Sequence, residues 1–144
     1  MSHVRQQVRT AFVDRLQGLP ITGTNVFDAR RRPIAAGAAP AILVYTNNEE
    51  LTYTVGDVAQ RAIAVTVSII AQALDDIDAL LDTISMHVEY AISSLPLVGF
   101  PSQLVSLQSV ETEVDTSGDQ LAGTMTLNYL MNIFTQTNAP EIAL

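Results

Sequence analysis

Residues 61–95, RAIAVTVSIIAQALDDIDALLDTISMHVEYAISSL, decide the fold of this chain. The first ten residues alternate between large apolar side chains and small or polar ones, which predicts a β-strand with one buried face. From residue 74 to residue 95, apolar residues recur every three or four positions, which predicts a long amphipathic helix. Asp75 or Asp76 can cap the start of this helix. A strand followed by such a helix indicates a helix that packs across a β-sheet.

The segments on both sides supply the remaining predicted elements. Helical spacing predicts a first helix over residues 3–17, and apolar or alternating runs predict further strands, one of them interrupted by a bulge near Ser109. These strands cover residues 25–30, 41–46, 51–55, 104–114 and 121–134, with 51–55 as one arm of a projecting hairpin. We therefore predict a single α+β domain over residues 1–144, with a mixed, mostly antiparallel sheet packed against two α-helices. Residues 135–144 are expected to form a loose, flexible C-terminal segment.

Charge is divided unevenly along the chain. All seven basic residues are arginines within positions 1–61, together with five acidic residues, whereas residues 62–144 carry ten acidic residues and no basic one. Two regions of opposite charge favour a protein that meets copies of itself, or two different partners, through distinct faces. The net charge is −8, and the dense basic cluster Arg30-Arg31-Arg32 contains no aromatic residue. Tight DNA binding is therefore not expected.

Patterns of residues that carry catalysis or bind metals are missing from the sequence. There is no cysteine, His3 is expected to lie in a frayed terminus, and His87 has no metal-ligand partner at helical spacing. No nucleophile elbow, phosphate-binding loop or dinucleotide fingerprint occurs. We expect a protein that is not an enzyme and uses no cofactor or metal. The absence of cysteine favours folding in a reducing cytoplasm. No apolar run is long enough to span a membrane, and the N-terminus lacks an apolar signal segment, so we expect no membrane partner.

Two charged groups are candidates for a subunit or partner interface. The arginine triplet consists of Arg30, Arg31 and Arg32, and the aspartate face consists of Asp75, Asp78 and Asp82, which share one side of the predicted helix. Both groups can simply be solvated surface. Alternatively, the triplet docks against an acidic surface, such as the aspartate face of the next copy, and a neighbouring subunit completes a weak Mg²⁺ or Ca²⁺ site at the aspartates.

In their order and spacing, these segments resemble the tail terminator proteins of phages with long, non-contractile tails, the family of the lambda minor tail protein U. The resemblance is carried by Val26-Phe27-Asp28-Ala29-Arg30, Pro40-Ala41-Ile42-Leu43-Val44-Tyr45, the strand over 62–70, the aspartate-rich helix start at 74–80 and the alternating strand that ends at 129–134. The arginine triplet, the loop over 33–40 and the residues after 135 depart from the family pattern.

The resemblance implies a homohexameric ring at the head-proximal end of the virion tail, assembled in the host cytoplasm. Its partners would be copies of itself, the tail tube protein and the head–tail connector protein, and DNA would pass through its lumen without specific binding. Three other interpretations stay open. The chain could be a head–tail joining or tail-completion protein of the same fold, a tail tube subunit, or a small acidic cytosolic binding domain.

Overall fold

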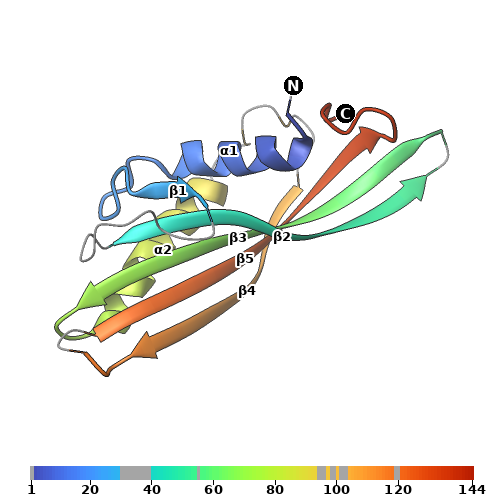
Figure 1. The fold of residues 1–144 in the computed structure, drawn as a ribbon. Coiled ribbons are helices and arrows are strands. Elements are labelled where there is room, and N and C mark those ends of the chain that lie inside the picture. Colours follow the sequence, from blue (N-terminus) through green and yellow to red (C-terminus); the bar gives the residue numbers. More distant parts are fainter. Residues whose placement is uncertain are drawn as a thin grey trace.

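The computed structural model describes residues 2–29, 40–54, 56–93, 97, 100, 104–118 and 121–144. Within these residues it confirms the predicted α+β class, with one mixed sheet and two helices (Figure 1). The elements in chain order are α1 (Val4–Leu16), β1 (Val26–Asp28), β2 (Ala41–Thr54), β3 (Val58–Ala73), α2 (Ile77–Ser93), β4 (Leu104–Asp115) and β5 (Leu121–Gln136). No helix in this described part of the chain is long and apolar enough to cross a membrane.

The strands lie in the order β1-β2-β3-β5-β4. β1 pairs in parallel with β2, and the other three pairs are antiparallel. The segment predicted over 41–46 and the described part of the one predicted over 51–55, residues 51–54, belong to one continuous strand, β2, which forms a long hairpin with β3. Gly56 and Asp57 in the hairpin turn both have positive φ, 90° and 61°, as tight hairpin turns require. The projecting hairpin is therefore longer than the sequence indicated.

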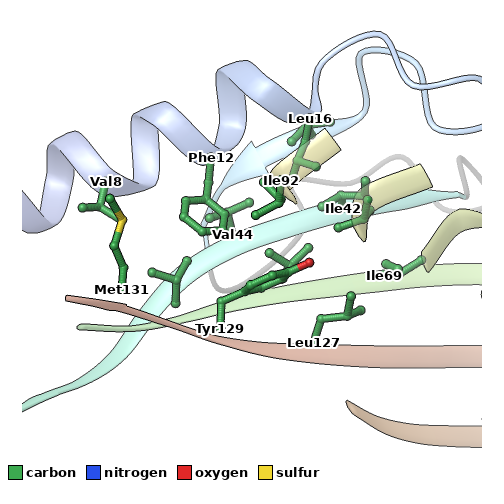
Figure 2. Close-up of a cluster of buried hydrophobic side chains, with 14 of the residues drawn as sticks. Val8, Phe12, Leu16, Ile42, Val44, Ile69, Ile92, Leu127, Tyr129 and Met131 are labelled. Carbon is green, nitrogen blue, oxygen red and sulfur yellow. The ribbon is translucent and has the colours of Figure 1, made fainter. Parts of the chain in front are cut away.

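Both helices pack on one face of the sheet, which we call the helix face (Figure 1). The alternation predicted for β3 and β5 is confirmed, because the large apolar residues of each strand point together into the core. Figure 2 shows Val8, Phe12 and Leu16 of α1 above Tyr129 and its neighbours on β5. The rings of Phe12 and Tyr129 meet edge to face, with centroids 5.7 Å apart. The opposite side of the sheet is called the reverse face below.

Helix α2 begins three residues later than its apolar spacing predicted. Asp76 adopts a positive φ of 44°, and its Oδ1 accepts the backbone N–H of Ala79 at 3.2 Å, so Asp76 is the N-cap. Leu74 lies before the cap and is 79% exposed, so its predicted place in the buried stripe was wrong. Beneath the first turns of α2, β5 carries Gly123. A Cβ there would lie 2.8 Å from Leu81 Cδ1, so the glycine lets α2 approach the sheet closely.

Two β-bulges lie at the same level on β2 and β4, the strands that flank the central pair. The bulge predicted near Ser109 is confirmed in β4, and a second one, which the sequence analysis missed, lies at Asn47 of β2. Between them runs a row of hydrogen bonds that takes one side chain from each of four strands. Asn47 Nδ2 donates to Thr66 Oγ1 (3.1 Å), Thr66 Oγ1 to Asn128 Oδ1 (3.4 Å), and Asn128 Nδ2 to Ser109 Oγ (3.0 Å). We call this the transverse row.

Beyond the transverse row the sheet continues as a narrower extension, which we call the arm. It comprises residues 48–54 of β2, 58–62 of β3 and 132–136 of β5. Figure 1 shows the arm projecting past both helices. The arm is long because pairing with β5 supports the β2–β3 hairpin up to its turn.

The C-terminal residues differ from the loose segment expected after residue 134. Strand β5 continues to Gln136, and the chain then folds back toward α1 and the arm (Figure 1). The N–H of Val4 donates to Pro140 O (3.0 Å), and the N–H of Leu144 donates to Phe134 O (2.8 Å). The first N–H groups of a helix have no partner within it, so the returning segment satisfies one of them.

Candidate assembly surfaces

A cluster of charged side chains lies where α1 meets the base of the arm. Glu49 Oε2 of β2 accepts from Arg61 Nη1 of β3 at 2.7 Å and from Arg5 Nη1 of α1 at 3.1 Å. Arg61 Nε also donates to Thr135 Oγ1 of β5 at 3.0 Å. The side chains of Glu49 and Arg61 are only 7% and 8% exposed, whereas Arg5 is 43% exposed. One carboxylate thus holds together the helix and two strands of the arm.

This arm-base cluster carries two positive charges and one negative charge. The second carboxylate oxygen, Glu49 Oε1, is buried and has no hydrogen-bond partner among the described residues. A buried carboxylate that loses its charge partners is costly, so the cluster fixes the position of the arm more strongly than an exposed ion pair does. The sequence analysis missed this cluster. The sequence signal for this cluster is the position of Arg61 two residues before Ile63. Residues two apart share one face of a strand, so Arg61 faces the helices as Ile63 does.

Three arginines of the basic half that the structure describes, Arg5, Arg9 and Arg61, form ion pairs within the molecule. Besides the arm-base cluster, Arg9 Nε of α1 forms an ion pair with Asp28 Oδ1 of β1 at 3.1 Å, and Arg9 Nη1 donates to Thr46 Oγ1 at 2.9 Å. Arginines that the sequence suggested as a free basic region therefore tie α1 to β1, β2 and β3. The acidic half contains no arginine or lysine with which to pair in this way.

His3 has a structural role that the sequence analysis did not predict. Its Nδ1 accepts the backbone N–H of Arg5 at 3.1 Å, so the neutral imidazole caps α1. Partial burial lowers the pKa of His3, and the positive charges of Arg5 and Arg61 lower it further, against a smaller opposing effect of Glu49 and Glu141. The cap and the arm-base cluster are therefore electrostatically coupled.

The predicted aspartate face is not formed as a single helix surface. Asp78 and Asp82 lie one turn apart on α2 and are exposed, but Asp75 precedes the helix cap. Among the residues that the structure describes, no group of three histidine, cysteine or acidic residues is placed to hold a metal ion. The arginine triplet lies outside the described residues, so its pairing with the aspartates stays a prediction.

The sheet has two unpaired edges in the described part of the chain. β1 pairs with β2 only over Ile42–Val44, which leaves the arm part of β2 paired on one side alone. At the other border, β4 pairs only with β5. The two edges differ in charge. The second half of β4 carries Glu111, Glu113 and Asp115, all exposed, whereas its first half is uncharged.

Exposed apolar side chains lie on both edges. On the arm, Leu51 is 39% exposed and Tyr53 is 68% exposed. On β4, Leu104, Val110 and Val114 are also exposed. Unpaired strand edges with apolar side chains are sites at which another chain can add.

Tyr129 of β5 carries a buried hydroxyl group in the core. The Tyr129 hydroxyl has no hydrogen-bond partner among the described residues, and burial raises the pKa of Tyr129, with a smaller contribution from the charge of Glu89. Because the Tyr129 ring packs against Phe12 in the core and its hydroxyl is buried, the hydroxyl marks a stability cost and no accessible site (Figure 2).

Comparison with models of known protein families and with curated proteins finds no match for this chain.

Proposed function

We propose that this chain is a structural subunit of a phage tail, and that it forms a ring which ends growth of the tail tube at its head-proximal end. The observation that carries this proposal is the pair of unlike, unpaired edges on opposite borders of one sheet. A subunit with two different complementary patches associates head to tail, and such contacts close into a ring when the rotation between subunits allows it. The resemblance in segment order supplies the kind of assembly.

The direction of the strands supports head-to-tail association. Every neighbouring pair from β2 to β4 is antiparallel, so β2 and β4 themselves run in opposite directions. When copies are repeated around a ring without inversion, β4 of one copy and β2 of the next are therefore antiparallel. Antiparallel pairing is the more stable arrangement for adjacent strands.

The proposed mechanism of termination is steric. One face of the ring matches the last ring of tail tube protein, and the other offers no surface for another tube ring but receives the head–tail connector protein. The net charge of −8 favours passage of DNA through the lumen without specific binding, because like charges repel. The site of action would be the virion tail.

The mass of the native protein tests this function. Light scattering over a range of protein concentrations, with and without Mg²⁺, is expected to show a discrete species of six 15.5 kDa chains, about 93 kDa. Addition of that species to polymerising tail tube protein is expected to shorten the tubes. Open-ended growth would instead identify a tube subunit, and a monomer that leaves tube length unchanged would identify a small binding domain.

A further inference from the structure

We infer that a second copy of this chain adds the free edge of its arm to the first half of β4, with Leu51 opposite Leu107 and Tyr53 opposite Val105. The inference deepens the proposed function by naming the surface through which one copy meets the next. It depends on that function only for closure of the ring, because the contact itself needs no particular number of copies. Four observations on the two edges carry it.

The first observation is that both edges have free backbone groups over matching lengths. Residues 48–54 of β2 pair only with β3, and β4 pairs only with β5 among the described residues. Each edge therefore presents backbone N–H and C=O groups that another strand can satisfy. The opposite directions of β2 and β4 make this added pair antiparallel in a head-to-tail arrangement.

The second observation is that the apolar side chains on the two edges point to the same side. Leu51 lies opposite Arg61, which faces the helices together with Ile63. Val105 and Leu107 lie opposite the core residues Met131 and Tyr129. When two sheets join edge to edge without inversion, their helix faces are continuous. Leu51 and Tyr53 of one copy then lie beside Leu107 and Val105 of the next, as apolar cross-strand pairs.

The third observation is the position of charge along β4. Residues 104–110 are uncharged, and the acidic residues follow at Glu111, Glu113 and Asp115. These three side chains share the reverse face with Glu50 of the arm, as their pairings with β5 and β3 show. Sliding the arm along β4 to pair with its second half would bring Glu50 opposite one of these carboxylates. Like charges directly opposite each other are unfavourable, so charge selects the first half.

The fourth observation is that the selected register places no two like charges opposite each other. With Leu51 opposite Leu107, Glu50 lies opposite the bulge residue Gln108, and Thr52 lies opposite Ser106 on the reverse face. Glu49 remains within its own arm-base cluster, where Arg61 and Arg5 neutralise it. The arm therefore arrives at β4 with its buried charge already paired.

Cysteine pairs test this register directly, because the chain has no natural cysteine. Within one copy, β3 and β5 separate β2 from β4, and residues 51 and 107 are also offset along the strands, so they are more than about 14 Å apart and cannot form a disulfide. In the double variant Leu51→Cys/Leu107→Cys, mild oxidation is expected to link different copies. The matched control is Leu51→Cys/Thr112→Cys, which has the same first thiol and a second one on the same face of β4. It is expected to link at least about tenfold more slowly.

A second measurement uses the unaltered protein. Amide hydrogen exchange in residues 48–54 is expected to slow at least about tenfold as protein concentration rises and copies associate. Equal linking of the two cysteine pairs, or unprotected arm amides in the associated protein, would overturn the inference.

The outcomes separate this inference from the proposed function. A 93 kDa ring in which the 51–107 pair does not link would retain the ring and refute this contact. Efficient 51–107 linking within open-ended polymers would retain the contact and refute the terminator.

The substitution Gln108→Glu would place a second carboxylate opposite Glu50. It should weaken association about threefold at low salt and less at high salt, since the repulsion between like charges is screened by ions. Gln6→Glu, on α1 outside the proposed contact, is the charge-matched control.

Discussion

Replacement of Glu49 by glutamine should show how strongly the arm-base cluster holds the arm to the rest of the molecule. The variant keeps the size and shape of the side chain but removes the negative charge between Arg5 and Arg61. Arg61 is 8% exposed and would keep its hydrogen bond to Thr135, yet its charge would be buried without a counter-charge. Arg5 is 43% exposed, so it can turn into water at little cost.

The expected loss is therefore set by one buried arginine. Removal of one partner of a buried ion pair costs about 3–5 kcal/mol. The glutamine amide oxygen can still accept one N–H from Arg61, which places the expected loss near the lower limit, about 3 kcal/mol. For a chain of this size, that loss lowers Tm by about 10 °C.

Urea unfolding at pH 7 measures this loss, at a concentration at which light scattering shows the monomer, because association would raise the apparent stability. Glu50→Gln is the matched control, since Glu50 is the next residue of the same strand but is exposed. The control is expected to stay within about 0.5 kcal/mol of the unaltered protein. If Glu49→Gln also stays within that range, the cluster does not fix the arm and the reasoning is refuted.

Three further predictions concern the core and the first helix. Gly123→Ala should lower the free energy of unfolding by about 2 kcal/mol, because its Cβ would meet Leu81 Cδ1 at 2.8 Å; an unchanged urea midpoint would mean that α2 shifts freely. Tyr129→Phe should raise stability by about 1 kcal/mol, measured as Tm, because it removes a buried hydroxyl that has no partner among the described residues. The exposed Tyr53→Phe serves as control, and a lower Tm for Tyr129→Phe would reveal a hydrogen bond that the structure does not show. The pKa of His3 is lowered in the folded protein, so the unfolded chain binds the proton more readily. Its contribution to stability should be complete above pH 6.5 and lost as the pH falls through the folded pKa. Relative to His3→Asn, which caps without titrating, the unaltered protein should lose stability between pH 7 and pH 5, and parallel profiles would contradict this role.

Elements whose signal is local could be predicted from the sequence. The alternation of β3 and β5 and the spacing in α2 each arise from one buried face, so neighbouring residues carry the information. The start of α2 was placed too early because Leu74 happens to fit the apolar spacing. The backbone turn at Asp76, one of the two caps that the sequence indicated, decides where the helix begins.

Features that depend on partners distant in the sequence could not be predicted. The arm-base cluster joins Arg5 to Glu49 across 44 positions, and neither residue has a distinctive neighbourhood in the sequence. The bulge at Asn47 likewise has no local signature, because Asn47 donates to Thr66 on another strand, and Thr66 in turn donates to Asn128 on a third. The prediction of one aspartate face was wrong because helical spacing was extended back to Asp75, which precedes the first residue of α2.

The extra residue at Asn47 determines which of two adjacent glutamates enters the molecule. Before it, even-numbered residues of β2 such as Val44 face the helices, and after it odd-numbered residues such as Glu49 do. If the strand ran straight through this position with Asn47 retained, the parity of the outer strand would reverse, turning Glu49 outward and Glu50 toward Arg61. Deletion of Asn47 would instead remove the bulge and leave Glu49 facing the helices, so the strand keeps its buried glutamate only when chain length and bulge change together.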